Sequence, residues 1–514
     1  MKIINPVIRG FYPDPSVCRA NGKYYMACSS FEYFPGVPLF ESEDLINWKQ
    51  IGHCLTRKTQ VDLEGINSSG GVFAPTIRFN DGRFYMVTTN DTYQKNFYVY
   101  TDDIYGEWSE PIFVDQDGID PSLFFEDGKT YFMSNGSDPE DNNGCIFQCE
   151  IDIGTGRKLT KSIPMWKGSG GRYLESPHLY HFGEWYYIMA AEGGTEYGHM
   201  VTYARGKSPY GPFEQYQHNP VLTNRNLGGH QSTIQGIGHG DLVEDGNGNT
   251  FMFCLGFRQT GMWQPFHHLG REVFIVPVHW DEDGWFSAGV DGIVQKEMEL
   301  DVDAGLCQCS SFNGNYNNNY SASFSNMDLN SLRWCHLREY KKENYRFADG
   351  CLSLRGIKTD LSGTGAPTFA GIRQAEFNTE LNVNVKSDAL EAGITFYQCE
   401  KHHYDLAVYN NGNIKSVILR LCIGDAVQVV KEQEFEEGTE TASLRVVSDN
   451  ECYKFYAKCG STEVFMGKAG TKYLSSEVAS GFTGTVMAMY AVNGQDNEDK
   501  WAVFDSFDWK QDRD

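Results

Sequence analysis

Short glycine-containing turns followed by aromatic-rich apolar runs recur through the first 300 residues of the chain. Asn-Gly or Asp-Gly between two strand-like runs is the strongest short-range signal of a β-hairpin. Repetition along the chain indicates that one supersecondary unit is used several times. We therefore predict five hairpins, in the segments NGKYYMACSS from Asn21, DGRFYMVTTN from Asp81, DGKTYFMSNG from Asp127, FGEWYYIMAAE from Phe182 and NGNTFMFCLGF from Asn247.

The strand that enters each hairpin starts at nearly the same distance from the hairpin glycine. The first residues of these strands are Asp14, Ala74, Asp120, Glu175 and His239; the glycine follows eight residues later, or nine in the case of His239. Repeated four-stranded units arrange radially as a β-propeller, in which equivalent positions of the innermost strands converge on the axis. We therefore expect a five-bladed β-propeller in which Asp14, Asp120 and Glu175 meet. A β-sandwich of similar length would not bring these positions together.

The pattern changes after Trp285. Residues 300–325 are polar and Asn-rich, which predicts a loop, and short alternating runs separated by turn residues then continue to the end of the chain. Such runs predict a β-sandwich. A length of 514 residues also exceeds one compact core. We therefore predict an all-β protein with a catalytic propeller over residues 1–300 and a supporting C-terminal β-sandwich over residues 301–514, whose loops contribute to the neighbouring site.

The composition narrows the function classes. Asp and Glu outnumber Lys and Arg by 68 to 43, and no segment concentrates positive charge, so neither nucleic acid nor an anionic membrane is an expected partner. No apolar stretch approaches the roughly 20 residues of a membrane span, and the segment MKIINPVIRG lacks the apolar core of a signal peptide. The 14 cysteines lack zinc-site spacing and predict free thiols, so we expect a cytoplasmic protein.

Three carboxyl groups around one axis fit the chemistry of glycoside hydrolysis. That reaction needs a carboxylic acid to protonate the leaving oxygen and a carboxylate to activate water or attack directly. A third carboxylate nearby raises the pKa of the acid. Asp14 and Asp120 each precede proline, which predicts an extended backbone at a strand start. Glu175 has the longer side chain and suits proton donation. His239 is either a neutral structural histidine or a ligand for water or a divalent ion.

Longer stretches around these residues are similar to one enzyme family. They are NPVIRGFYPDPSV, SSFEYFPGVPLFESEDLINW, SSGGVFAPTIR, GIDPSLFFEDGKTYF, GGRYLESPHLY, GIGHGDLV and HLGREVFIVPVHW. The chain resembles glycoside hydrolase family 43, in particular the β-xylosidase branch with a C-terminal, concanavalin-like β-sandwich. The resemblance implies an inverting, exo-acting hydrolase that requires no cofactor. By position, Asp14 would be the general base, Glu175 the general acid and Asp120 the residue that tunes the acid, while His239 would lie beside a calcium ion or a water.

The resemblance also implies residues that contact the sugar. Arg271 in LGRE would hydrogen-bond sugar hydroxyls or help to set the carboxylate charges, and Phe31 would pack against the sugar at the blind end of the pocket. Phe482 and Thr483, in the FTGT loop of the second domain, would close the pocket mouth. Phe73 stands where the family commonly has Trp before Ala-Pro, which alters the stacking surface.

Several functions stay open at this point. The intact FEYFPGVP segment and the long second domain favour a β-1,4-xylosidase acting on short xylo-oligosaccharides. An α-L-arabinofuranosidase, or an enzyme with both activities, would use a sugar of similar hydroxyl geometry, and an idle propeller would only bind sugar. A retaining fructan hydrolase is a further alternative, but enzymes of that group differ from this chain in the sequence of the strand that carries the nucleophile. Because an inverting enzyme separates its carboxyl groups by about 6.5–9.5 Å and a retaining one by about 5 Å, we predict the longer separation between Asp14 and Glu175. The family resemblance also implies a homodimer or homotetramer.

Overall fold

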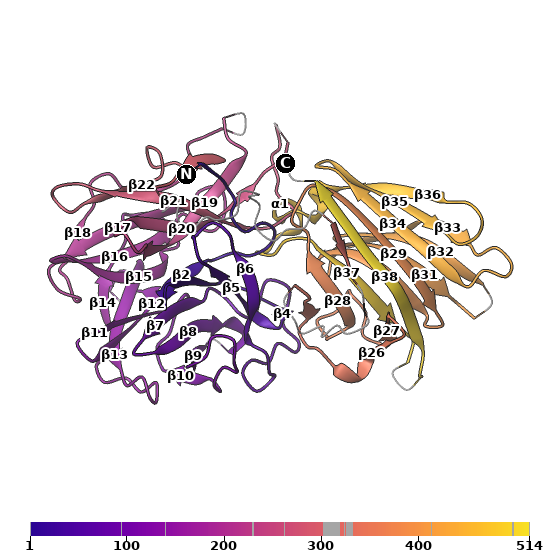
Figure 1. Cartoon of the computed structure of the whole chain (residues 1–514), viewed down its shortest axis with the longest axis horizontal. Coiled ribbons are helices and arrows are strands. Elements are labelled where there is room, and N and C mark those ends of the chain that lie inside the picture. Colours follow the sequence, from indigo (N-terminus) through magenta and orange to yellow (C-terminus); the bar gives the residue numbers. More distant parts are fainter. Residues whose placement is uncertain are drawn as a thin grey trace.

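The computed structural model describes residues 2–512 except 94, 139, 229–230, 262, 302–318, 323, 325–332, 413 and 496–497. These residues form two bodies that lie side by side (Figure 1), and nearly all regular elements in both are β-strands. The described part of the chain has no helix long and apolar enough to cross a membrane. The predicted all-β class is therefore confirmed.

Five four-stranded antiparallel sheets make up the N-terminal body. Their strands are β2 (Ser16–Ala20), β3 (Lys23–Ala27), β5 (Gly36–Ser42) and β6 (Lys49–Leu55); β7 (Thr76–Asn80), β8 (Arg83–Asn90), β9 (Lys95–Thr101) and β10 (Ile112–Val114); β11 (Ser122–Glu126), β12 (Lys129–Ser137), β13 (Gly144–Ile151) and β14 (Ile163–Trp166); β15 (Glu175–Phe182), β16 (Trp185–Glu192), β17 (Met200–Gly206) and β18 (Glu214–Gln215); and β19 (Ile234–Glu244), β20 (Thr250–Arg258), β21 (Glu272–Trp280) and β22 (Phe286–Ala288). The first strand of each sheet contacts the first strands of both neighbouring sheets, so five innermost strands close a ring. The predicted five-bladed β-propeller is confirmed.

The predicted hairpins are the turns between the first and second strands of the blades. In blades one to three, two residues connect the strands and both have positive φ, as at Asn21 (52°) and Gly22 (79°). Asn, Asp and Gly tolerate this left-handed region, and the resulting turn matches the twist of the strands. In blade five a longer loop separates the paired residues Glu244 and Thr250. This agrees with the sequence, in which the hairpin glycine follows His239 by nine residues instead of the eight found in the other blades.

The N-terminal segment closes the ring on the last blade. β1 (Lys2–Ile4) pairs with β23 (Glu297–Glu299), which follows blade five. The next residue, Asn5, is bound to β21 of blade five: its Nδ2 donates to the carbonyl oxygen of Ile275 at 3.0 Å, and the Ile275 N–H donates to Asn5 Oδ1 at 3.1 Å. The two ends of the propeller sequence are thereby held on the same blade.

The C-terminal body is the predicted β-sandwich, made of two antiparallel sheets. One contains β26 (Tyr345–Ala348), β27 (Cys351–Arg355), β38 (Trp501–Asp512), β29 (Asn378–Ser387), β34 (Thr441–Ser448), β35 (Cys452–Lys458) and β36 (Val464–Gly470), with β24 (Asn319–Ser321) paired to β38; the other contains β28 (Thr368–Arg373), β37 (Val486–Val492), β30 (Glu391–Cys399), β31 (His402–Asn410), β32 (Lys415–Ile423) and β33 (Ala426–Glu434). The short helical elements are η1 (Asp91–Tyr93) in the propeller and η2 (Lys342–Asn344), η3 (Thr471–Leu474) and α1 (Ser476–Ala479) in the sandwich.

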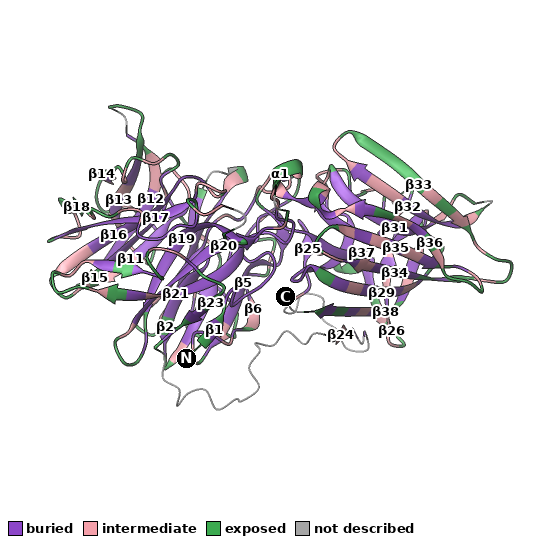
Figure 2. Ribbon diagram, turned by 90° about the horizontal axis from the view of Figure 1, so that it is seen from above, coloured by how far each residue is buried: buried purple, intermediate pink, exposed green. Residues whose placement is uncertain are grey.

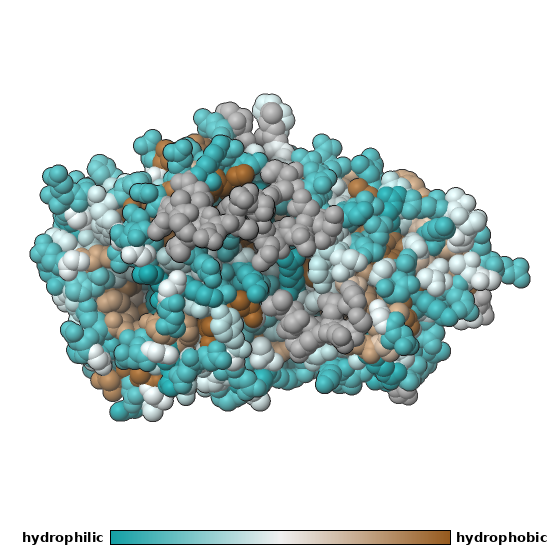
Figure 3. All heavy atoms as spheres, viewed as in Figure 1, coloured by the Kyte–Doolittle hydropathy of each residue, from teal (hydrophilic) through white to brown (hydrophobic). Residues whose placement is uncertain are grey.

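Burial follows the alternation of apolar and polar residues. In β29 every second residue is buried, so one face of the strand meets the core and the other meets polar surroundings. β33, at the edge of the six-stranded sheet, is mainly exposed (Figure 2). Hydrophilic side chains cover most of the face shown in Figure 3, in keeping with the high negative charge of the chain.

The two bodies are joined by backbone pairing and by buried ion pairs. The boundary predicted at residue 300 falls between β23 and β24, and most of the predicted Asn-rich loop lies outside the described residues. Beyond it, β25 (His336–Leu337) pairs with β4 (Tyr33–Phe34) of the propeller.

The ion pairs of the junction involve two arginines and two glutamates. Arg258 of β20 donates to both oxygens of Glu272, at 2.8 and 2.9 Å, and to Glu376 of the sandwich at 2.9 Å. Arg9 also pairs with Glu376. All four side chains are buried, and the directional hydrogen bonds fix how the sandwich sits on the propeller.

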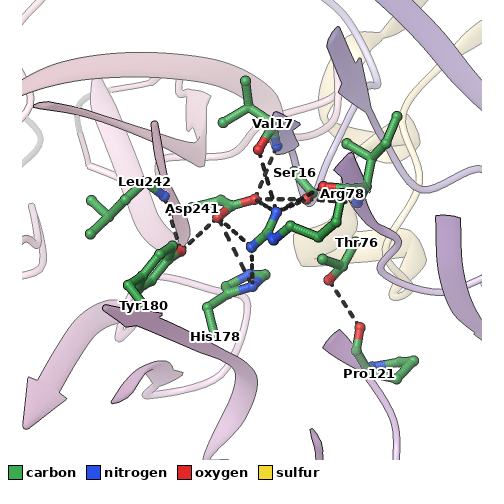
Figure 4. A network of polar contacts seen from close by, with 10 residues as sticks. Ser16, Val17, Thr76, Arg78, Pro121, His178, Tyr180, Asp241 and Leu242 are labelled. Atoms are coloured by element: carbon green, nitrogen blue, oxygen red, sulfur yellow. Dashed lines mark hydrogen bonds and ion pairs between the residues drawn. The ribbon is translucent and has the colours of Figure 1, made fainter. Parts of the chain in front are cut away.

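A buried carboxylate on the propeller axis joins four of the five blades (Figure 4). Asp241, in β19, is completely buried. Its Oδ2 accepts hydrogen bonds from Ser16 Oγ (2.7 Å) and the Val17 N–H (3.0 Å), and its Oδ1 accepts from the Tyr180 hydroxyl (2.6 Å). Arg78 donates to both oxygens, at 2.8 and 2.9 Å. Blades one, two, four and five therefore share one negative charge.

We predict that Asp241→Ala lowers the free energy of unfolding by about 3–5 kcal/mol, because it leaves the guanidinium of Arg78 buried without its counter-ion. Urea titration followed by tryptophan fluorescence measures the change. Asp102→Ala, which removes the partner of Arg83 in an exposed ion pair, is the control and is expected to leave stability nearly unchanged. Equal effects of the two substitutions would contradict the assignment.

Candidate active site

The candidate catalytic residues occupy corresponding places at one end of the innermost strands. Asp14 and Asp120 each lie two residues before a first strand, β2 or β11, and Glu175 is the first residue of β15. His239 lies within β19, next to a register irregularity. The charge of Asp14 acts on both Asp120 and Glu175, and the charge of Glu175 acts on Asp120. The structure therefore brings together three carboxyl groups from three blades.

The backbone at this end of the ring is in the left-handed region. The φ angles are 57° at Asp14, 53° at Asp120, 55° at Ser176 and 50° at His239. The expectation of an extended backbone at the two Asp-Pro sites is therefore wrong. The following proline disfavours the right-handed helical region, but Asp also populates the left-handed region at a modest steric cost. Such conformations persist where surrounding contacts over-determine them, and they cluster at functional sites.

Asp14 is set up as an ionised carboxylate. It is buried, its Oδ1 accepts a hydrogen bond from Arg271 Nη1 at 2.9 Å, and the Ser29 hydroxyl donates to its Oδ2. His239 Nδ1 lies 3.6 Å from Oδ1. Burial raises the pKa of Asp14, but the charge of Arg271, helped by His239 and Ser29, outweighs burial and holds the pKa below its usual value. At neutral pH the group is therefore negatively charged.

Glu175 and Asp120 are shifted in the opposite direction. Burial, followed by the negative charge of Asp14, raises the pKa of Glu175 to about 7, although Arg271 opposes the shift. Burial and the charges of Glu175 and Asp14 raise the pKa of Asp120, against a hydrogen bond from the Ser176 N–H. The surroundings thus favour the ionised form of Asp14 and the protonated forms of its two neighbours. Such a split in pKa is what separates an acid from a base.

Arg271 connects the propeller carboxylate to the sandwich. Besides Asp14, its Nη1 donates to Thr195 Oγ1 at 2.7 Å, and its Nη2 donates to the carbonyl oxygen of Phe482 at 3.1 Å. The guanidinium carbon lies 5.6 Å from the ring centroid of Phe31 and 5.8 Å from that of Phe482. Two aromatic faces from different domains therefore enclose the charged group.

Aromatic rings gather around Phe31. Its ring centroid lies 5.6 Å from that of Phe73, 5.9 Å from that of Phe11 and 6.0 Å from that of Phe482. Phe31 and Phe11 are buried, whereas 42% of Phe482 is exposed. The cluster offers an apolar floor beside the charged groups, which suits the C–H face of a sugar ring.

A cavity of about 630 Å³ opens between the two domains at this place. Its lining includes Tyr173, Glu175, Thr195, Glu196, Tyr197, His267 and Arg271 from the propeller and Ser476, Glu477, Ser480, Gly481 and Phe482 from the sandwich. Thr483 is not part of this lining. Its side chain is buried, and its hydroxyl donates to the carbonyl oxygen of Gln398 at 3.3 Å. Of the FTGT loop, Phe482 therefore reaches the cavity and Thr483 anchors the loop.

His239 is neutral. Burial and the charge of Arg271 lower its pKa, although Asp14 acts in the opposite sense. Calcium takes about six to eight oxygen ligands. Within the described ranges, no group of three or more His, Cys, Asp or Glu side chains could hold a metal ion, and Asp14 already accepts hydrogen bonds from Arg271 and Ser29. The side chains around His239 therefore do not fit a calcium site built from protein oxygens.

Sequence reasoning missed several residues of the site. Ser29 and Thr195, which hydrogen-bond to Asp14 and Arg271, follow the second strand of blades one and four. The signal was present, because the repeats end in polar residues such as the Ser-Ser after MAC. Tyr173 lines the cavity from the segment before β15 and Glu477 from the short helix α1, and neither position follows the repeat pattern.

The sequence matches two family profiles that together cover most of the chain. One, described as glycosyl hydrolases family 43, matches residues 3–286, and the other, the β-xylosidase C-terminal concanavalin A-like domain, matches residues 321–510. The chain is 37% identical over 519 residues to the non-reducing end α-L-arabinofuranosidase BoGH43B of Bacteroides ovatus, covering 98% of this chain and 94% of that one. It is 32% identical to a xylosidase/arabinosidase of Butyrivibrio fibrisolvens, covering 98% of both chains.

Solved structures agree over the full length. The Bacteroides ovatus Xyloglucan PUL GH43B structure superposes with a TM-score of 0.91 at 36% identity, covering 99% of this chain and all of that one. The xylan β-1,4-xylosidase from Bacillus halodurans C-125 superposes with a TM-score of 0.88 at 28% identity and similar coverage (99% and 100%). Profile, sequence and structure therefore lead to one conclusion: the chain belongs to glycoside hydrolase family 43 and is a glycosidase.

Proposed function

We propose that the protein is an inverting, exo-acting glycosidase that releases xylose from the non-reducing end of short β-1,4-xylo-oligosaccharides. The observation that carries the proposal is the opposite shift of the pKa values of two neighbouring groups, Asp14 and Glu175, the second of which lines the cavity between the domains. A protein that only bound sugar would have no use for such a split. The sandwich loop that carries Phe482 covers one side of this cavity, and a pocket limited in this way suits the end of a short chain.

In the proposed reaction, Asp14 accepts a proton from a water molecule whose oxygen forms the new bond to the anomeric carbon. Glu175 gives its proton to the leaving glycosidic oxygen as the old bond breaks. The negative charge that raises the proton affinity of Glu175 is that of Asp14, and we assign Asp120, whose carboxyl group interacts with that of Glu175, to orienting the acid. Each step uses the protonation state that the surroundings favour in that carboxyl group.

Arg271 has two parts in this proposal. It keeps Asp14 ionised, and its side chain lines the cavity, where it would donate a hydrogen bond to a sugar hydroxyl. Phe31 packs against the sugar ring at the closed end. We further propose that no cofactor takes part, that the protein acts in the cytoplasm, and that it assembles as a dimer or tetramer.

A second candidate is hydrolysis of α-L-arabinofuranosides by the same groups. The name of the Bacteroides ovatus relative favours it, and that of the Butyrivibrio fibrisolvens relative combines both activities. Phe73 is the residue in the aromatic cluster that departs from the expected Trp, and it contacts Phe31 rather than any carboxylate. The acid–base machinery would therefore serve either pentose, and the shape of the floor would select between them.

We predict a bell-shaped pH profile of kcat/KM. Activity requires Glu175 to hold its proton, so it falls as the pH rises through about 7. It also requires Asp14 to be ionised, so the acid limb lies below the usual Asp value of about 4. Glu175→Gln is expected to remove the alkaline limb and to lower kcat/KM about 10²–10⁴-fold. An unchanged alkaline limb in this variant would assign the acid to another residue.

We predict faster hydrolysis of 4-nitrophenyl β-D-xylopyranoside than of the α-L-arabinofuranoside. Release of 4-nitrophenol at matched concentrations measures both rates. Asp14→Ala is expected to lower both about 10²–10⁴-fold, because the general base is lost, whereas the exposed control Asp115→Ala leaves them unchanged. Faster hydrolysis of the arabinofuranoside would favour the second candidate function. If neither substrate is cleaved, the protein either only binds sugar or hydrolyses a glycoside of another sugar.

We predict that the first product of β-xyloside hydrolysis is α-xylose. An inverting enzyme delivers water to the face opposite the leaving group, so the anomeric configuration changes. Proton NMR spectra recorded in the first minutes, before mutarotation, distinguish the two anomers. Initial release of the β-anomer would overturn the inverting mechanism and, with it, the longer separation expected between Asp14 and Glu175.

A further inference from the structure

A second, smaller cavity lies between the propeller and the sandwich, and none of the three catalytic carboxyl groups lines it. Its volume is about 40 Å³, and it is lined by Tyr12, Phe40 and Trp48 from the propeller and by Arg373 and Trp509 from the sandwich, with Arg9 and Arg333 also in its wall. No Asp or Glu is among the described residues that line it. The wall therefore combines aromatic surface with hydrogen-bond donors and positive charge.

Arg373, the last residue of β28, is a buried cation that forms no salt bridge with any described residue. It is 4% exposed, and none of its three guanidinium nitrogens makes a well-aligned hydrogen bond in the described part of the chain, although the Tyr12 hydroxyl lies close enough to interact with it. An arginine side chain stays protonated in proteins. The buried carboxylates of the domain junction, Glu272 and Glu376, are already paired with Arg258 and Arg9. The guanidinium lies 4.7 Å from the ring centroid of Tyr12, and this contact compensates only part of the cost of burial.

Trp509 supplies a second donor without a partner. Its side chain is 3% exposed, and its indole Nε1 makes no hydrogen bond within the described residues. An indole N–H can only donate. Trp48, on the opposite wall, differs in this respect, because its Nε1 donates to the carbonyl oxygen of Leu45 at 2.9 Å. Arg373 and Trp509, whose nitrogens lack a partner among the described residues, thus both offer donors, and one of the two side chains is charged.

We propose that this cavity binds a small monovalent anion, chloride, between the guanidinium of Arg373 and the indole N–H of Trp509. The single negative charge of the ion would balance the positive charge of Arg373, which forms no salt bridge with any described residue. A water molecule needs about 10–15 Å³ of such space, so a cavity of about 40 Å³ accommodates a halide. Aromatic walls favour a weakly hydrated ion, since a divalent oxyanion would lose far more hydration energy on entering.

The anion would act on the joint between the domains and not on the chemistry. Tyr12 and Phe40 belong to the first blade, whereas Arg373 and Trp509 belong to the two sheets of the sandwich. An ion held between them binds only when the sandwich is docked, and a ligand that binds only the folded, docked state stabilises it by mass action. Binding of chloride in this cavity would not depend on which sugar the enzyme cleaves.

Thermal unfolding at constant ionic strength tests the proposal, with chloride exchanged stepwise for gluconate. The wild-type melting temperature is expected to rise with chloride and to saturate. Arg373→Met should abolish the rise, and Trp509→Phe should shift its midpoint to about tenfold higher chloride, because a hydrogen bond to a charged group contributes roughly that factor. Arg346→Met, which removes an exposed arginine stacked on Trp501 of the same sandwich, should keep the wild-type response.

Crystals of the wild-type protein soaked in bromide supply a direct readout that does not depend on any variant folding. An anomalous peak between Arg373 and Trp509 is expected. The proposal is overturned if this position holds only water in bromide-soaked crystals. A melting temperature that does not depend on chloride, or a response that Arg373→Met retains, would overturn it as well. Stabilisation by phosphate in place of chloride would reject the monovalent anion.

Discussion

The hydrogen bonds and ion pair of one buried carboxylate, Asp241, hold together the part of the propeller on which the active site rests (Figure 4). Asp241 follows His239 by two residues in β19, and Ser16 follows Asp14 by two residues at the start of β2. The network therefore lies next to the catalytic end along the same strands. Because hydrogen bonds to a charged group are short and directional, they set the relative height of four blades, and the catalytic carboxyl groups take their positions from those strands.

The protonation states of the catalytic carboxyl groups depend on how strongly the charge of Arg271 acts on each of them. Arg271 lies close enough to Asp14 to keep it ionised, and its influence on Glu175 is weaker than burial and the charge of Asp14 together. The ionised Asp14 then raises the proton affinity of its two neighbours. A single guanidinium, placed asymmetrically among three carboxyl groups, is thus enough to make one of them a base and to leave another as an acid.

Much of this arrangement could be predicted from sequence because it repeats. The glycine-containing turns, most of them Asn-Gly or Asp-Gly, locate the hairpins, and counting back from the glycines identifies the strand entrances where Asp14, Asp120 and Glu175 lie. The left-handed backbone at Asp14 could not be predicted, because a following proline excludes the right-handed helical region without choosing between the remaining ones. Contacts between domains, such as that of Arg271 with the Phe482 carbonyl, depend on docking and leave no periodic trace.

Docking of the sandwich is itself achieved by polar groups as much as by apolar ones. Arg258 and Arg9 pair with Glu272 and Glu376, and the guanidinium of Arg338 is bound to Glu400 and to the Ile66 carbonyl oxygen of the propeller. Buried ion pairs recover little net stability, since desolvation offsets most of the attraction. Their effect is geometric: a shift of the sandwich would leave several buried charges unpaired at once. The Phe482 loop is carried by this rigidly oriented domain, so the pocket wall it forms and its hydrogen bond to Arg271 are placed with the precision that the catalytic carboxylates require.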